Sequence, residues 1–132
     1  MMLRTICKSK IHRATVTGAD LHYIGSIGID ADLLARVDIV PGEAVAVWNV
    51  NNGQRIETYA IALPAGSGSV VVNGAAARHF SPGDVVIIVA FCLTDEAVTP
   101  RMIAVDAANH FLRDLADGAP DQPLVTTPAP RP

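Results

Sequence analysis

The stretch Ser26–Asp30 (SIGID), followed by a Pro-Gly turn at 41–43 (PGE), has a near copy later in the chain. There Ser69–Asn73 (SVVVN) is followed by a second Pro-Gly turn at 82–84 (PGD), and an apolar strand is expected after each turn. The separations from serine to proline are nearly equal. Pro-Gly turns are common, so chance similarity is the alternative to an internal repeat. If the repeat is real, two halves of strand, helical turn and strand predict one closed barrel, which removes exposed sheet edges.

Around these two stretches, Gly, Pro and Asn separate short segments rich in Val, Ile and Thr, which are typical of strands. A helix is expected over 30–37, capped by Asp30 or Asp32, and a short helix is expected to end at Leu115. Asn73 is expected to cap the helical turn of the second half, and 51–53 (NNG) predicts a hairpin turn. The expected strands cover residues 3–8, 14–17, 45–50, 55–63, 69–72, 85–91 and 102–106.

The 132 residues fit one domain, and we expect a single β-barrel domain over residues 1–115. From residue 116 onward the chain is mostly Ala, Pro, Asp, Gly and Thr, which predicts a flexible, disordered C-terminal tail over 116–132. The longest apolar run, 85–93, is much shorter than the about 20 residues of a membrane-spanning helix. The N-terminus has no stretch of signal-peptide type, so we expect no membrane association.

The net charge of −3 and the scattered Lys and Arg residues argue against a nucleic-acid partner. Cys7 and Cys92, without an export signal, favour two reduced thiols in a cytoplasmic protein. The histidines His22, His79 and His110 show no ligand spacing with one another or with the cysteines, so we expect no metal.

Gly-Ser occurs three times and alone indicates only a loop, but the copy at Gly25-Ser26 lies within a distinctive segment, 19–26 (ADLHYIGS). Four further motifs occur in the chain. One, 10–14 (KIHRA), precedes this segment, and three follow it: 48–49 (WN), 58–61 (TYAI) and 73–77 (NGAAA). From about Leu3 to Asp106 the sequence resembles the pyruvoyl-dependent aspartate 1-decarboxylases.

The resemblance implies a mostly β fold, a small closed six-stranded double-psi β-barrel with short helices. It implies self-cleavage between Gly25 and Ser26 into fragments 1–25 and 26–132. It further implies decarboxylation of L-aspartate to β-alanine and CO2, for pantothenate and coenzyme A biosynthesis, by a homotetramer with active sites between subunits.

The chemistry is consistent with these residues. Loss of CO2 leaves a carbanion at Cα that needs an electron sink. Pyridoxal phosphate is a common sink, but the chain has no recognised Gly-rich phosphate loop, so we expect none bound. A covalent pyruvoyl group made from Ser26 would serve through a Schiff base with the substrate amine. Gly25 suits self-cleavage because a residue without Cβ tolerates strained backbone angles and leaves its carbonyl accessible to the Ser26 hydroxyl.

Three residues of the strand over 55–63 receive roles. The resemblance gives Thr58 the hydroxyl that stabilises the oxyanion of self-cleavage and contacts substrate, and gives Tyr59 protonation of the carbanion. Arg55 is the candidate for gripping a substrate carboxylate, because its planar fork matches one bidentately. Alternation places Arg55 and Tyr59 on one strand face and Thr58 on the other. They reach one site if the strand twists or if sites form between subunits, and we favour the second.

The remaining candidates are weighed against plainer alternatives. Lys10 and His12 share a face and would carry positive potential toward a dicarboxylate, or form a solvated basic edge. Trp48 is interpreted as core, although the family places it near the pocket. Relatives carry His directly after the Ala run, where this chain has Arg78 and then His79. The start of a helical turn presents backbone N–H groups that would bind substrate; these belong to Asn73, Gly74, Ala75 and Ala76. The alternative is that the same residues only form a capped turn of small packing residues.

Three other functions stay open. A non-catalytic small β-barrel module that binds a partner protein would share the architecture, since fold alone does not decide function. A pyruvoyl enzyme acting on another amino acid is a second alternative. A serine hydrolase is disfavoured because no Gly-x-Ser-x-Gly elbow surrounds Ser26. Gly25-Ser26 together with Tyr59 favours the decarboxylase, because a binding module needs neither.

Overall fold

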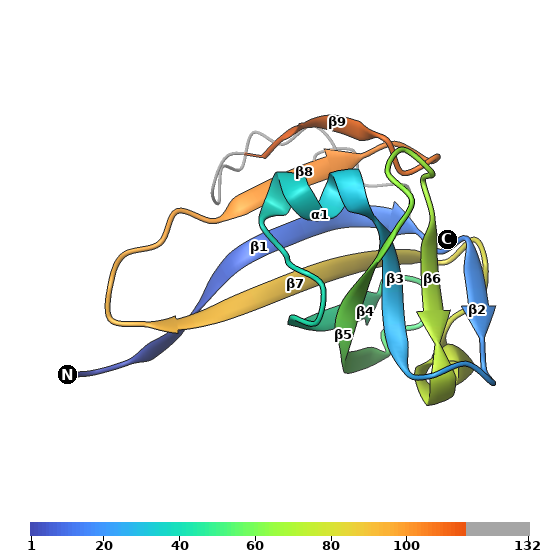
Figure 1. The fold of residues 1–132 in the computed structure, drawn as a ribbon, viewed down its shortest axis with the longest axis horizontal. Helices are drawn as coiled ribbons and strands as arrows, with labels where there is room; N and C mark the ends of the chain where they lie inside the picture. Colours follow the sequence, from blue (N-terminus) through green and yellow to red (C-terminus); the bar gives the residue numbers. More distant parts are fainter. Residues whose placement is uncertain (116–132) are drawn as a thin grey trace.

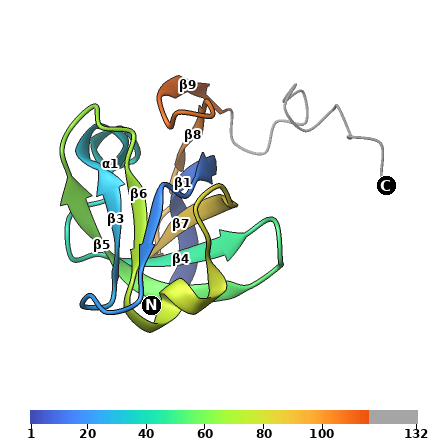
Figure 2. The same ribbon diagram turned by 90° about the vertical axis from the view of Figure 1, so that its right-hand side faces the viewer.

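The computed structural model describes residues 1–115 as a mostly β molecule (Figures 1 and 2), which confirms the predicted class. The predicted tail, 116–132, lies outside the described residues. The elements are, in chain order, β1 (Arg4–Thr15), β2 (Gly18–Asp20), β3 (Ser26–Asp30), α1 (Ala31–Val37), β4 (Ala44–Asn49), β5 (Arg55–Leu63), β6 (Val70–Asn73), the 3₁₀ helix η1 (Gly74–His79), β7 (Val85–Thr94), β8 (Arg101–Val105) and β9 (Phe111–Asp114).

The strands form one sheet in the order β2-β6-β3-β5-β4-β7-β1-β8-β9. The long strands β1 and β7 run side by side across one part of the molecule, and β2, β3 and β6 form the other (Figure 1). The sheet has nine strands, so the expected count of six is wrong; the short strands β2 and β9 pair with β6 and β8 at its two ends. Within residues 1–115 the end strands β2 and β9 do not pair with each other, and closure of the sheet into a barrel stays a prediction.

The internal repeat is confirmed by strand pairing. β3 and β6 pair antiparallel, with Ser26 opposite Asn73 and Ile29 opposite Val70. The strands that follow the two helical turns, β4 and β7, also pair antiparallel. Each half therefore faces its counterpart across an approximate two-fold relation.

The two Pro-Gly turns repeat the same hydrogen bonds. Gly42 and Gly83 have φ values of 92° and 94°. The Gly42 N–H donates to Ala60 O at 2.7 Å, and the Gly83 N–H donates to Val16 O at 2.8 Å. The return bonds run from the N–H groups of Ala60 and Val16 to the carbonyls that follow each glycine, at 3.0 and 2.8 Å. The two turns therefore have the same local geometry, as the repeat predicts.

The helix expected over 30–37 is confirmed as α1. The Asp30 carboxylate accepts the Asp32 N–H at 2.8 Å, as a cap does. Burial alone would raise the pKa of Asp30, but the backbone N–H groups of Gly68, Asp32 and Gly66 hold it below its ordinary value. The prediction for Asn73 is wrong, because its side chain makes no capping bond to η1 and points to Ser26 instead.

Two other boundaries differ from expectation. The strands expected at 3–8 and 14–17 are one strand, β1, with register shifts at Cys7/Ser9 and Ile11/Ala14. Such bulges interrupt side-chain alternation, so the pattern predicted two strands. The helix expected to end at Leu115 is β9, which pairs with β8 after a turn in which the Asp106 carboxylate accepts two N–H groups.

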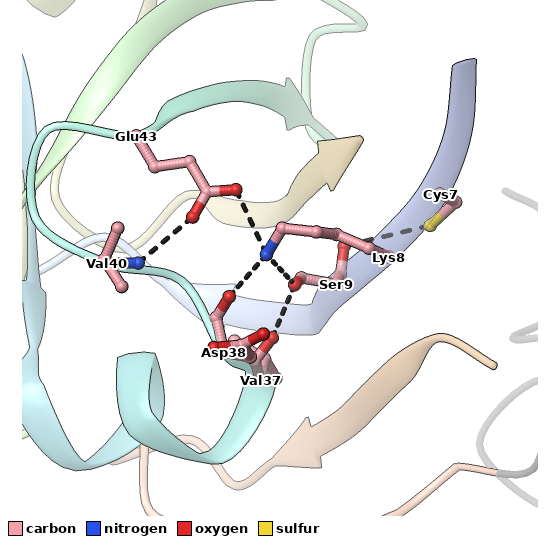
Figure 3. Close-up of polar contacts among 7 residues, drawn as sticks. All are labelled: Cys7, Lys8, Ser9, Val37, Asp38, Val40 and Glu43. Atoms are coloured by element: carbon pink, nitrogen blue, oxygen red, sulfur yellow. Dashed lines mark hydrogen bonds and ion pairs between the residues drawn. The ribbon is translucent and has the colours of Figure 1, made fainter. Parts of the chain in front are cut away.

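A polar cluster fixes the first bulge of β1 to α1 (Figure 3). Lys8 Nζ lies 3.0 Å from Glu43 Oε2 and 3.0 Å from Ser9 Oγ, and also donates to the Asp38 carbonyl. The Ser9 hydroxyl donates to the Val37 carbonyl at the end of the helix. The cluster therefore holds the Pro-Gly turn that precedes β4.

The core lies between the sheet and α1, and no helix among residues 1–115 is long and apolar enough to cross a membrane. Its largest fully buried side chains are aliphatic, as the scarcity of aromatic residues requires. They are Ile11, Ile27, Ile29, Leu33, Ile88, Ile103, Val16, Val37, Val47, Val70, Val72 and Val86.

Candidate active site

Ser26 begins β3 and is held by two hydrogen bonds. Its side chain is buried, with 2% of the residue exposed. Asn73, directly opposite on β6, donates from Nδ2 to Ser26 Oγ at 3.0 Å, and the hydroxyl donates to Ile24 O at 3.3 Å. These two bonds thus fix the hydroxyl of the proposed nucleophile, which directly follows Gly25. Asn73, expected as a helix cap and substrate contact, is also the residue that holds this hydroxyl.

Tyr59 lies on the strand next to Ser26. β3 and β5 are parallel with Ile27 opposite Ala60, so Ser26 and Tyr59 are the preceding residues of the two strands. Tyr59 is 40% exposed, which argues against a side chain that only anchors the strand. Thr58 pairs with the buried Val45 and therefore faces the opposite side, as alternation predicted. The role of Thr58 in self-cleavage stays a prediction.

A cavity of about 220 Å³ adjoins this strand row. Asp20 on β2 is opposite Asn73 and lines it together with Tyr23. Sequence reasoning did not select Asp20 or Tyr23, although both lie in the 19–26 motif, and that proximity was the available signal. The cavity is lined by Asp20, Tyr23, Ile61, Leu63, Val71 and Asn73.

The backbone at Gly25 differs from expectation. Gly25 is absent from the glycines with positive φ, and a Cβ added to it would have no atom within 4 Å. In this conformation Gly25 therefore shows no left-handed backbone strain, and the suggestion that glycine suits self-cleavage here stays a prediction. The residue is exposed, which leaves its carbonyl side open as expected.

Arg55 lies in a different cavity, of about 500 Å³, on the outer side of the sheet. Its guanidinium carbon is 4.4 Å from the centre of the Trp48 ring, a cation–π contact. Trp48 is half-buried and lines this cavity, so its interpretation as a core residue is wrong. The other lining residues are Ala46, Ile56, Glu57 and Phe91.

Within one chain, Arg55 lies far from Ser26. Four residues of extended strand separate Arg55 from Tyr59, which is about 13 Å. The cavity beside Asn73 and the cavity beside Arg55 have no lining residue in common. A single subunit therefore does not assemble all the predicted site residues.

Lys10 and His12 lie on the same side of the sheet as Arg55. A row of paired residues crosses the sheet from Lys10 on β1 to Glu57 on β5, through Val89 and Ala46. Glu57 is two residues from Arg55 and so shares its strand face. His12 follows on the same face of β1, opposite Ala104. The prediction that Lys10 and His12 share a face is confirmed.

The charge on His12 needs correction. Burial, and then the charges of Lys10 and Arg13, lower the pKa of His12 from its ordinary 6.5. The imidazole is thus neutral at pH 7, and its Nε2 is buried without a hydrogen-bond partner among residues 1–115. Positive potential comes from Lys10, while His12 offers a neutral donor or acceptor.

This lowered pKa predicts how stability changes with pH. As pH falls through 6.5, the unfolded chain takes up a proton at His12 before the folded chain does, so the free energy of unfolding decreases. His12→Gln is expected to show a shallower decrease between pH 7 and pH 5, measured by urea unfolding. His22→Gln, which removes an exposed histidine, is the control and should follow the wild type. Equal slopes for wild type and His12→Gln would contradict this assignment.

The 73–76 segment stands at the junction of β6 and η1. Gly74 is buried, Ala75 is exposed and Ala76 is half-buried. Arg78 and His79 are exposed at the end of η1. Substrate binding by these backbone groups stays a prediction. No group of three His, Cys, Asp or Glu residues that could hold a metal occurs in the described part of the chain.

Comparison with known proteins decides the family. A family model described as aspartate decarboxylase matches residues 2–112, a range that includes Ser26, Tyr59, Asn73 and the β1 and β5 candidates. The chain belongs to the aspartate decarboxylase family. An aspartate 1-decarboxylase from Moorella thermoacetica is 59% identical to this family member over 114 residues, 83% of this chain and 89% of the relative.

One solved structure shows a weaker likeness to this aspartate decarboxylase family member. It is the crystal structure of the rationally designed mkDPBB_sym_86 protein, 18% identical, with a TM-score of 0.44. The match covers 60% of this chain and 91% of that chain. A TM-score of this size assigns no fold.

Proposed function

We propose that this chain is a self-processing, pyruvoyl-dependent aspartate 1-decarboxylase. It converts L-aspartate to β-alanine and CO2, which serves pantothenate and coenzyme A biosynthesis. The observation that carries the proposal is Ser26, buried at the start of β3 with its hydroxyl held by Asn73, in a chain 59% identical to an aspartate 1-decarboxylase. The free thiols of Cys7 and Cys92 support the cytoplasm as its location.

Self-cleavage would begin at the Ser26 hydroxyl. Its oxygen attacks the Gly25 carbonyl carbon, the peptide C–N bond breaks, and an ester joins Gly25 to the Ser26 side chain. Loss of the Ser26 Cα proton expels the Gly25 carboxylate and leaves dehydroalanine at position 26. Water then replaces the nitrogen, which leaves as ammonia, and a pyruvoyl group remains. Thr58 is the proposed donor to the oxyanion of the first step.

The residues around position 26 fit such a group. The pyruvoyl group supplies an electron sink for the carbanion at the substrate Cα. Asn73 Nδ2 donates to Ser26 Oγ before cleavage, and because that oxygen leaves with the Gly25 carboxylate, this amide would then be free to donate to substrate. Tyr59, partly exposed on the neighbouring strand, is placed to give a proton to the substrate Cα after CO2 leaves.

Substrate binding would be completed by a second subunit in a homotetramer. Arg55, Lys10 and His12 lie on the sheet face outside the Ser26 row, so one chain cannot bring them to Ser26. That face also exposes 43% of Phe91 and 66% of Leu93, which a neighbouring subunit would cover. Contributions from the 73–76 backbone N–H groups would complete the carboxylate contacts. The double-psi arrangement is supported by the parallel pairs β1·β8 and β3·β5.

Turnover of aspartate tests the function and the role of Arg55. The wild type is expected to produce β-alanine from L-aspartate and to use L-asparagine poorly, because asparagine lacks the side-chain carboxylate. Arg55→Lys keeps the charge but loses the fork and the planar contact with Trp48. Loss of a charge-assisted contact costs about 1.5–3 kcal/mol, so kcat/KM should fall about tenfold to a hundredfold. Chromatography of β-alanine measures both effects.

The controls separate the two claims. Arg101→Lys changes an exposed arginine outside the described cavities beside Asn73 and Trp48, and should leave kcat/KM near the wild-type value. If asparagine or alanine were used as well as aspartate, Arg55 would not have this role. If no amino acid were decarboxylated, the enzyme function itself would be refuted, and the binding-module alternative would stand.

A further inference from the structure

Gly74 has an unusually close neighbour. It begins η1 with a φ of +75° and is buried. A Cβ added to Gly74 would lie 2.7 Å from Gly25 Cα, 2.9 Å from Gly25 N and 3.3 Å from Tyr23 O. All three neighbours are backbone atoms, so no side-chain rotation could relieve the overlap. Any side chain at position 74 would therefore force the backbone to move, either around Gly74 or in the segment that ends at Gly25.

The left-handed backbone alone does not explain this glycine. Gly42, Gly53 and Gly83 also have positive φ, yet a Cβ added to any of them would have no atom within 4 Å. Gly25 itself likewise has open space around it. Near the scissile bond, the position that has no room for a side chain is therefore Gly74 and not Gly25.

Asn73 and Gly74 together contact both sides of the scissile bond. Asn73 donates to the Ser26 hydroxyl, while the Gly74 Cα packs against the Gly25 backbone. Ser26 is located by its pairing in β3, whereas residues 21–25 belong to no strand and are largely exposed. The position of the Gly25 carbonyl relative to the Ser26 oxygen thus depends on what the 21–25 segment packs against.

We propose that Gly74 is a positioning residue for self-cleavage. Its missing side chain lets the Gly25 backbone settle where the Ser26 oxygen can attack the carbonyl carbon. The inference rests on the proposed self-processing function. This positioning role is distinct from the substrate contact proposed for the Gly74 N–H. The two roles can be separated because Gly74→Ala keeps that N–H.

Gly74→Ala is expected to slow cleavage by about 10²-fold, because a displacement of about 1 Å between reacting groups costs that much. The matched control is Gly53→Ala, whose φ of +78° carries the same backbone strain without the contact. Intact mass follows the disappearance of each full-length chain with time, and thermal unfolding compares their stabilities. Gly53→Ala should cleave at nearly the wild-type rate.

A second measurement distinguishes positioning from a general loss of structure. In an uncleavable Ser26→Ala background, crystal structures with and without Gly74→Ala should differ in the position of residues 21–25 and agree in β1 and β7. An unchanged position of the Gly25 backbone in the Gly74→Ala structure would overturn the proposal. Equal cleavage rates of Gly74→Ala and Gly53→Ala would also overturn it.

Ile24→Gly keeps the proposal testable if Gly74→Ala does not fold. Ile24 is 74% exposed in the 21–25 segment, so this variant should keep the fold but loosen the segment and slow cleavage. Cleavage of Ile24→Gly at the wild-type rate would refute the role of this packing in positioning the Gly25 carbonyl. A wild-type chain that never cleaves would instead refute the proposed function, so the two failures are distinguishable.

Discussion

Ser26→Ala is expected to remain one chain of 132 residues without decarboxylase activity, whereas the wild type is expected to separate into fragments 1–25 and 26–132. The reason is that alanine has no oxygen to attack the Gly25 carbonyl, so neither the cleavage nor the electron sink can form. Intact-mass analysis measures the fragments directly. The larger wild-type fragment should also resist N-terminal sequencing, because a keto group replaces its amine.

Two further variants test the assignment around Ser26. Thr58→Val removes the proposed oxyanion donor with little change in shape, so it should fold but process poorly. Ser67→Ala alters another Gly-Ser pair, in an exposed turn, and should process as the wild type does. A wild-type chain that stays at full length after prolonged incubation at raised temperature would refute the pyruvoyl interpretation.

Tyr59→Phe is expected to cleave normally and yet lose about 10²–10⁴-fold in turnover, the range for general acid catalysis. In the proposed mechanism Tyr59 acts only after CO2 leaves, when the substrate Cα must be protonated. The phenylalanine ring fits the same half-exposed place, so the fold should be retained. The measurements are the intact masses of both fragments and the rate of β-alanine formation.

Borohydride trapping supplies the control for substrate binding. Processed Tyr59→Phe incubated with aspartate should still trap substrate covalently on the larger fragment, without normal turnover. Near-normal turnover would transfer the proton-donor role to another group, with His12 the first candidate. Failure to self-cleave would instead connect Tyr59 to maturation and contradict the division of roles between Thr58 and Tyr59.

Much of the fold was predictable because local rules agree with the final structure. The β class, the α1 helix with its Asp30 cap, the hairpin turn at 51–53 and the two-half repeat all followed from residue types and spacing. These features depend on turn chemistry and apolar runs within a few residues. Local sequence therefore specified them.

The errors arose where distant residues decide the outcome. The local pattern predicted two separate strands where the structure has one, β1. Pairing with β7 and β8 continues through the bulges at Lys8 and Arg13, so the strand is not interrupted there. β9 forms a strand rather than a helix because β8 offers it an edge. Trp48 belongs to a cavity rather than to the core because Arg55 covers its ring.

The sequence by itself determined the family motifs, the candidate nucleophile Ser26 and the opposite faces of Thr58 and Tyr59, because motif order and strand alternation are properties of the chain. Only the tertiary structure decided that Asn73 holds Ser26 and that Gly74 lies against Gly25, since 47 residues separate Ser26 from Asn73 along the chain. It also decided that Arg55 and Ser26 lie apart in one subunit. The physical reason is that strand pairing between the two repeats, and not sequence proximity, sets which side chains meet at the proposed cleavage site.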